Sequence, residues 1–181
     1  GGMPNNEFGD FQTPLALARR CLEVLALPQH GPIRVLEPTC GQGAFLRATK
    51  ERNPTSMRYG IDINADYVQV ARNYGTVAHA NVFTRNLADI SWPDPTAPLF
   101  VIGNPPWVTA AELNRMGSNN IPPKKNYKGM PGIAALLGNS NFDVCEYIIL
   151  KALTELRGQP LRLGMLCKTH VARNVLMECA R

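Results

Sequence analysis

The chain has 181 residues, of which 45% are hydrophobic, and a formal net charge of +5 at pH 7. These values predict one domain able to bury a core, and the positive charge favours a polyanionic partner such as a nucleic acid. The five cysteines are widely spread without a C-x-x-C pair, which argues against a zinc or other metal site and against a disulfide framework. No apolar run approaches the length that spans a membrane, so we expect a cytoplasmic protein without membrane contact.

Residues 1–30 are predicted to form an N-terminal helical region. Thr13 and Pro14 are typical of a helix start, with threonine as the N-cap and proline at the first helical position. Apolar residues then recur at helical spacing as far as Leu25, and the prolines and glycine that follow are expected to end the helix.

A strand, a glycine turn and a helix come next. Residues 33–37 read as a buried strand, and a helix is predicted from Ala44 to Arg52. Gly41 and Gly43 lie in the turn between them, where they allow a ligand to approach the backbone closely. Beyond the turn, the start of the helix offers unpaired N–H groups. This unit is the first half of a nucleotide-binding α/β fold.

The residues around this turn exclude two common ligands. Leu46 stands where a dinucleotide fingerprint needs its third glycine, and no Walker lysine follows the glycines. The ligand is therefore predicted to be neither a dinucleotide nor a triphosphate. Glu37, directly before the turn, would repel phosphates but attract a cationic ligand.

Polar residues follow each of the predicted strands. Strands are expected over residues 57–61, 76–80, 99–103 and 161–167, with helices over residues 65–72, 142–156 and 171–180. This alternation predicts a doubly wound, mainly parallel sheet whose ligand binds at the carboxyl ends of the strands. Glu37, Asp62, Asn81 and Asn104 all fall at such ends. Asp62 suits ribose hydroxyls, and equally suits the N-cap of the helix that follows.

A rigid polar corner follows the strand at residues 99–103. Asn104, Pro105, Pro106 and Trp107 offer an amide oxygen, a backbone carbonyl and a flat ring, and the prolines have no N–H to donate. This set suits a planar group that carries an NH2, such as the amino edge of adenine stacked on Trp107. The alternative is a proline-rich turn with a tryptophan that simply packs.

Residues 108–141 form a loop insertion that is too long for an ordinary connection. Lys124, Lys125 and Lys128 are interleaved with asparagine and tyrosine in this loop, directly after the predicted base pocket. Their position favours contact with DNA phosphates, and a solvated loop is the alternative.

In this order, the motifs resemble those of S-adenosylmethionine-dependent N6-adenine DNA methyltransferases. The resemblance rests on Thr13-Pro14, on residues 37–46, on Gly60-Ile61-Asp62 and on the Asn-Pro-Pro-Trp motif at residues 104–107. It is strongest to enzymes of restriction–modification systems, including those that fuse methylation and cleavage in one chain. The resemblance implies a Rossmann-like class I methyltransferase fold. It also implies that residues 1–181 are a single catalytic domain cut from a larger protein, because the C-terminal strands and the target-recognition region of the family are missing.

The resemblance also assigns roles by motif. It implies S-adenosylmethionine as cofactor, with S-adenosylhomocysteine as product, and cofactor contacts by Thr13, Glu37, Pro38, Thr39, Cys40, Gly41, Gly43, Asp62, Ile63, Asn81, Val82, Asn104 and Pro106. Asn104, the Pro105 carbonyl and Trp107 would hold the target base. The family usually has aspartate where this chain has Asn81, so weaker cofactor binding is expected, since a bond to a charged acceptor is roughly twice as strong as one to a neutral acceptor.

The implied function is methyl transfer to the N6 amine of adenine in double-stranded DNA, with a fused or separate nuclease and target-recognition domain as partners. Methylation of an RNA base or of a protein glutamine amide remains an alternative, because these substrates also present a planar NH2. A non-catalytic module that binds cofactor or DNA is a third possibility.

Overall fold

A computed structural model describes residues 12–107, 109 and 143–167 of the chain. The predicted helix over residues 171–180 and the lysines at positions 124, 125 and 128 lie outside the described residues. Within the described ranges, no helix is both long enough and apolar enough to cross a membrane.

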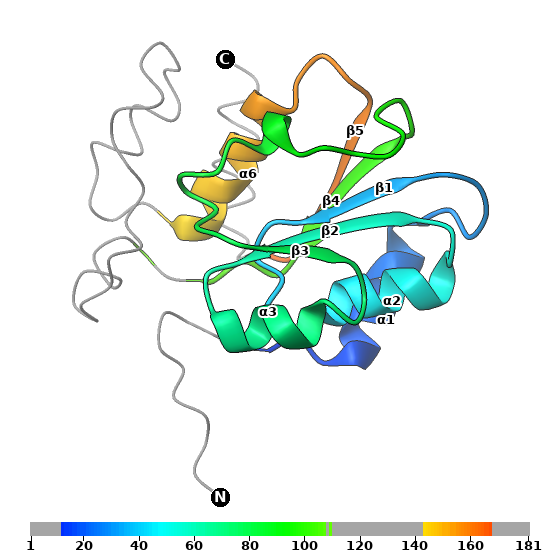
Figure 1. Cartoon of the computed structure of the whole chain (residues 1–181), viewed down its shortest axis with the longest axis horizontal. Coiled ribbons are helices and arrows are strands. Elements are labelled where there is room, and N and C mark those ends of the chain that lie inside the picture. The colour runs from blue at the N-terminus through cyan, green and yellow to red at the C-terminus, as the bar shows by residue number, and fades with distance from the viewer. Residues whose placement is uncertain (1–11, 108, 110–142, 168–181) are drawn as a thin grey trace, which may run out of the picture.

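Five parallel strands form one sheet in the order β3-β2-β1-β4-β5 (Figure 1). The strands are β1 (Arg34–Glu37), β2 (Met57–Asp62), β3 (Thr76–His79), β4 (Leu99–Gly103) and β5 (Leu161–Met165). The chain builds outward from β1 to β3, then returns to place β4 on the other side of β1. The point between β1 and β4, where the order reverses, is where doubly wound sheets bind their ligands.

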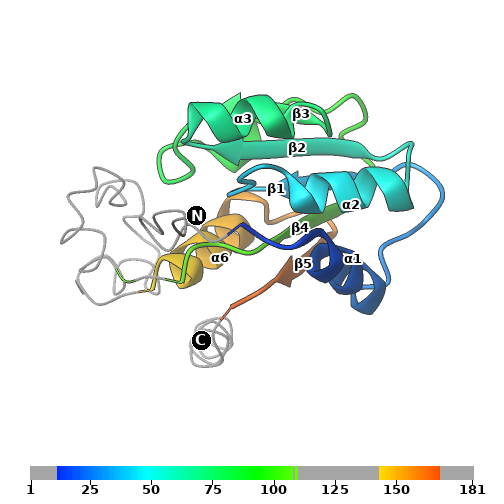
Figure 2. The same ribbon diagram turned by 90° about the horizontal axis from the view of Figure 1, so that it is seen from below.

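Helices cover both faces of this sheet (Figures 1 and 2). One face carries α1 (Leu15–Val24), α2 (Ala44–Arg52) and α3 (Ala65–Ala71), and the other carries α6 (Val144–Glu155). A short 3-10 helix, η2 (Leu87–Asp89), lies between β3 and β4 in the sequence and contacts α6. The predicted α/β class and doubly wound, parallel sheet are therefore confirmed.

Side chains alternate between two cores because successive residues of a strand point to opposite faces. Val35 and Phe100 pack with α1 and α2, in a cluster that includes Phe45. Leu36 and Val101 point the other way and pack against α6. Both faces of the central strands are buried, which explains why β4 reads as a continuous apolar run.

The predicted start of the first helix is wrong by one residue. Pro14, rather than Thr13, is the N-cap of α1, and no side chain caps the helix. The hydroxyl of Thr13 instead accepts a hydrogen bond from Asn104 Nδ2 at 3.4 Å. The Thr13 hydroxyl is therefore engaged by Asn104 and does not cap the helix, which is why the capping pattern gave the wrong start.

Gly43 is the N-cap of α2 and has a φ of +91°. A Cβ atom at this position would lie 3.1 Å from the backbone of Ala71 in α3. Gly31 has a similar φ of +86°, but a Cβ there would meet nothing within 4 Å. The two glycines thus share a left-handed backbone conformation, which would strain any other residue, and differ in their surroundings.

We expect Gly31→Ala to lower the free energy of unfolding by about 1–2 kcal/mol, the cost of a left-handed conformation. Gly43→Ala should cost about 1–3 kcal/mol more, because the added methyl group forces α2 and α3 apart. Urea unfolding of both variants measures the difference. Equal losses would contradict the packing role of Gly43.

Candidate functional site

A pocket lies at the carboxyl ends of β1, β2 and β4, beside the point where the strand order reverses. Its lining contains eight residues predicted from the sequence, namely Thr13, Glu37, Thr39, Cys40, Gly41, Asp62, Asn104 and Pro106. Gln12 and Ala44 also line it and were not predicted. The structure therefore brings the first glycine turn, the end of β2 and the Asn-Pro-Pro-Trp corner into one site.

Asp62 holds the glycine turn in place. Its Oδ2 atom accepts from the backbone N–H of Gly41 at 2.9 Å, and its Oδ1 atom accepts from the N–H of Asn64 at 2.9 Å. The N-cap of α3 is Asn64, whose side chain accepts from Asp66 and Tyr67, so the alternative of Asp62 as N-cap is wrong. The Asp62 carboxylate instead remains on the pocket wall.

The two glycines of the turn, Gly41 and Gly43, have different roles. Gly41 lines the pocket, and a Cβ at this position would lie 2.7 Å from Gln12 Oε1. That same oxygen accepts from the backbone N–H of Gln42 at 3.1 Å, so Gln12 closes over the turn. Gly43 packs against α3 and does not line this pocket. The only sequence signal for Gln12 is its position beside Thr13.

The Asn-Pro-Pro-Trp corner presents an amide and an exposed ring. Asn104 donates from Nδ2 to Thr13, and its Oδ1 atom is buried with no hydrogen-bond partner among the described residues. Trp107 is 44% exposed, and its indole N–H donates to the Leu166 carbonyl at 3.3 Å. Trp107 is therefore not buried in the core.

Three buried side-chain oxygens that line the pocket find no hydrogen-bond partner in the described part of the chain: Glu37 Oε1, Thr39 Oγ1 and Asn104 Oδ1. A buried polar group without a partner costs about 1–3 kcal/mol. Such oxygens at one pocket fit a ligand that carries hydrogen-bond donors or positive charge. The Glu37 carboxylate and the Asn104 amide oxygen can only accept, so these two do not fit a phosphate, which is itself an acceptor.

The electrostatics of Glu37 agree with this preference. The Glu37 residue is 2% exposed. Burial raises the pKa of its carboxyl well above the ordinary value, and the nearby charge of Asp62 raises it further, whereas the backbone N–H of Leu46 lowers it. A cation placed beside this carboxyl would favour the ionised form and relieve the cost of burying it.

Other predicted residues lie outside the pocket lining. Pro38 and Pro105 are buried, and Ile63 is exposed, with a carbonyl 2.9 Å from His79 Nε2. Val82 is also buried, in the segment that follows β3. None of these residues, nor Trp107, lines the pocket.

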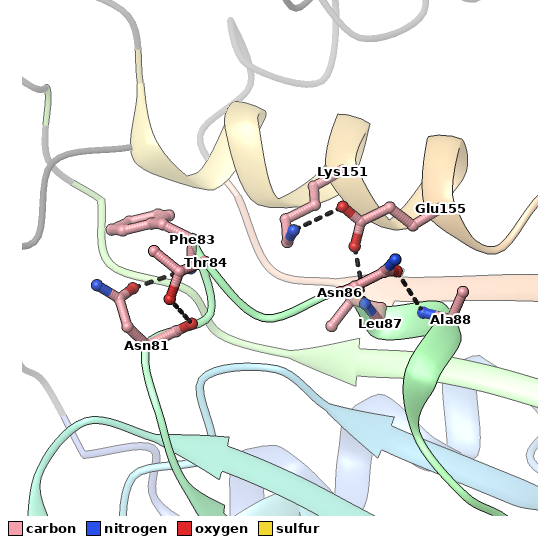
Figure 3. Close-up of polar contacts among 8 residues, drawn as sticks. All are labelled: Asn81, Phe83, Thr84, Asn86, Leu87, Ala88, Lys151 and Glu155. Carbon is pink, nitrogen blue, oxygen red and sulfur yellow. Dashed lines mark hydrogen bonds and ion pairs between the residues drawn. The ribbon is translucent and has the colours of Figure 1, made fainter. Parts of the chain in front are cut away.

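Asn81 precedes Val82, outside the pocket lining. Its Oδ1 atom accepts from the backbone N–H of Phe83 at 2.9 Å, and the amide nitrogen points away from that bond (Figure 3).

The sheet order, with a pocket at its switch point, is that of a Rossmann-like fold. A solved structure of a modification subunit of a putative type I restriction enzyme from Vibrio vulnificus has the same fold. It superposes with a TM-score of 0.61 at 17% identity, over 94% of this chain and 38% of the other.

Curated proteins give a closer similarity. The type II methyltransferase M.NspV of a Nostoc species is 33% identical over 178 residues, which are 94% of this chain and 37% of the relative. The type II methyltransferase M.TthHB8I of Thermus thermophilus is 30% identical over 109 residues, which are 59% of this chain and 23% of the relative. No model of a protein family matches the chain. The resemblance to methyltransferases of restriction–modification systems is therefore confirmed, for a chain that spans about a third of the Nostoc relative.

Glu37 should make stability depend on pH. Because the folded protein holds this proton more tightly than the unfolded chain, the stability linked to Glu37 is fully present below the ordinary value of 4.5 and is lost as pH rises through the folded pKa. Glu37→Gln removes this loss, so the variant should gain stability relative to the wild type as pH rises.

Urea unfolding of both proteins from pH 4.5 to about pH 8 measures this difference. Titrating groups that do not interact with Glu37 cancel in the comparison, since both proteins share them, whereas Asp62 interacts with Glu37 and contributes to the difference. A difference that stays constant with pH would show that the Glu37 pKa is not raised.

Proposed function

We propose that the protein transfers the methyl group of S-adenosylmethionine to the exocyclic N6 amine of adenine in double-stranded DNA, within a restriction–modification system. We further propose that a nuclease and a target-recognition unit, fused or separate, act with it. The observation that carries the proposal is the set of buried, unpartnered oxygens of Glu37, Thr39 and Asn104 on one pocket wall. The similarity to type II methyltransferases supports the same reaction class.

The residues of the pocket fit the cofactor. Bound there, S-adenosylmethionine would supply an activated methyl group on a positively charged sulfur. Glu37 and Thr39 would accept from its cationic amino-acid end, and Asp62 would accept from its ribose hydroxyls. Gly41 lines the pocket with its backbone alone, and a side chain at this position would meet Gln12. Asn81 and the Val82 backbone, which follow the next strand, would meet the adenine ring.

Asn104 and Pro105 would prepare the target amine. The lone pair of N6 is delocalised into the adenine ring, which makes this nitrogen a poor nucleophile. Asn104 Oδ1 and the Pro105 carbonyl would each accept one N6 hydrogen, which draws the amine toward tetrahedral geometry and localises the lone pair. Positioning and electrostatics then supply most of the rate, and no strong general base is required.

Trp107 suits a base that has left the duplex. Flipping a base costs a few kcal/mol, and stacking on an aromatic ring returns about 1–3 kcal/mol. The Trp107 ring is exposed and its N–H is tied to Leu166, so the ring is held in place and yet available for stacking. An RNA base would stack equally well, whereas a glutamine amide would offer the ring a smaller planar surface.

Asn104→Ala should lower the rate of methyl transfer by about 100-fold or more, because one of two preorganised acceptors is lost. Cofactor affinity should stay nearly unchanged, since Asn104 Oδ1 is assigned to the target amine. Transfer of labelled methyl groups to mixed DNA, RNA and protein measures the rate and the substrate class, and calorimetry with S-adenosylmethionine measures the affinity.

These measurements also separate the alternatives. Label in RNA or protein would favour the other substrates, and cofactor binding without transfer by the wild type would favour a non-catalytic module. Equal loss of binding and transfer in Asn104→Ala would contradict the role assigned to Asn104.

Asn81→Asp should strengthen cofactor binding by about tenfold. The Asn81 Oδ1 atom is already engaged by the Phe83 N–H, so the remaining atom of the amide is a donor facing the adenine amine, itself a donor. Aspartate keeps the bond to Phe83 and adds a charged acceptor, and hydrogen bonds to charged groups contribute about 1.5–3 kcal/mol.

Asn86→Asp is a matched control, because Asn86 Oδ1 makes the same kind of bond to the Ala88 N–H at 2.9 Å (Figure 3). This change adds the same charge a few residues further along. Calorimetry with S-adenosylmethionine compares the two variants. Similar affinities in both would mean that position 81 does not meet the adenine ring.

A further inference from the structure

The segment that carries Asn81 and Val82 is held from the α6 side of the sheet. This segment, residues 81–89, runs from the end of β3 through η2. Its first turn is closed locally, by Asn81 Oδ1 on the Phe83 N–H and by the Thr84 hydroxyl on the Asn81 carbonyl. These bonds fix the shape of the turn but do not attach it to the rest of the molecule.

Three residues of α6, each four positions apart, face this segment: Tyr147, Lys151 and Glu155 (Figure 3 shows the last two). The Tyr147 ring meets the Phe83 ring edge-on, with centroids 5.6 Å apart. Glu155 Oε1 accepts from the backbone N–H of Leu87 at 2.8 Å, and Lys151 Nζ lies 2.6 Å from Glu155 Oε2.

Burying the ion pair of Lys151 and Glu155 costs desolvation free energy. The Lys151 side chain is 2% exposed and that of Glu155 is 14% exposed, in a helix whose neighbouring residues are apolar. Burial lowers the pKa of Lys151, although Glu155 opposes this effect. Buried ion pairs are often no more stable than apolar residues of the same size. Stability alone therefore does not account for a charged pair at these positions.

An apolar pair could not do what Glu155 does. Leu87 is the first residue of η2, so its N–H has no partner within the helix. Asn86, the N-cap, accepts from the N–H of Ala88 and leaves that of Leu87 to Glu155. Lys151 in turn directs the carboxylate of Glu155, because Oε2 is held by the ammonium while Oε1 faces the backbone.

We propose that Glu155, oriented by Lys151, is a positioning residue that sets residues 81–89 against the sheet and thereby sets the affinity for the adenine end of the cofactor. The part of this inference that concerns cofactor affinity rests on the proposed function. The part that concerns the position of residues 81–89 rests on the structure alone.

Two double variants separate the hydrogen bond from the charge. Lys151→Met with Glu155→Gln removes both charges but keeps an oxygen for the Leu87 N–H. Lys151→Met with Glu155→Leu removes the charges and the oxygen together. Each variant removes both charges of the pair together, so neither Lys151 nor Glu155 is left without the other, and both variants should fold. Arg20→Met with Glu23→Leu is the control, since it removes an exposed ion pair three residues apart on α1.

The leucine variant should exchange the Leu87 amide hydrogen about tenfold faster and bind S-adenosylhomocysteine about tenfold more weakly, with little change in kcat at saturating S-adenosylmethionine. The glutamine variant should fall between the leucine variant and the wild type, because it keeps an oxygen for the Leu87 N–H but loses the charge and the lysine that directs it. The control should stay within about twofold of the wild type in each measurement. A residue with a merely structural role would lower the unfolding midpoint without raising KM and Kd together.

Unchanged Leu87 exchange in the leucine variant would overturn the inference, and so would faster exchange with unchanged Kd. Failure of the wild-type protein to bind S-adenosylhomocysteine would overturn the proposed function together with the cofactor half of the inference. The exchange data would still decide whether Glu155 holds the segment, so the two failures are distinguishable.

Discussion

The hydrogen bonds of Asp62 connect the loops on which the rest of the site depends. One carboxylate oxygen holds the glycine turn through Gly41, and the other holds the start of the α3 loop through Asn64. The two loops follow β1 and β2, which are neighbours in the sheet, so one side chain fixes the spacing of two strand ends. Without these bonds, the N–H of Gly41 would be a partly buried donor beside the pocket. The Asp62 carboxylate therefore both holds the two loops together and lines the pocket.

A site built of acceptors is costly in the absence of a ligand. Glu37, Thr39 and Asn104 each bury an oxygen without a partner in the described part of the chain, and Glu37 adds a carboxyl that burial keeps from ionising easily. The parallel sheet offsets the cost of burying these oxygens, because β1 and β4 are buried on both faces and hold the strand ends in place. Preorganised acceptors of this kind do not need to reorient when a donor arrives, which is the condition for strong electrostatic stabilisation.

The sequence predicts much of this fold because its elements are local. The helix Ala44–Arg52 and the strand Leu99–Gly103 match the predicted bounds, since apolar periodicity and flanking glycine act within a few residues. The gathering of Glu37, Asp62 and Asn104 at one pocket follows from the parallel order of the strands alone. Contacts between segments that are far apart in the chain cannot be predicted from these local patterns. Thr13 reads as a helix cap because nothing local shows that Asn104 lies beside it.

The same limit applies to Lys151 and Glu155. A lysine and a glutamate four residues apart on a helix are commonly an exposed pair, and only the packing of α6 against residues 81–89 shows that both are mostly buried here. Different kinds of contact therefore position the site on the two faces of the sheet. On the α1–α3 side, close glycine contacts and Asp62 set the end of the pocket assigned to the amino acid. On the α6 side, one charged hydrogen bond sets the segment assigned to adenine. On this arrangement, we expect changes on the α6 face to act mainly on the end of the ligand that is assigned to adenine.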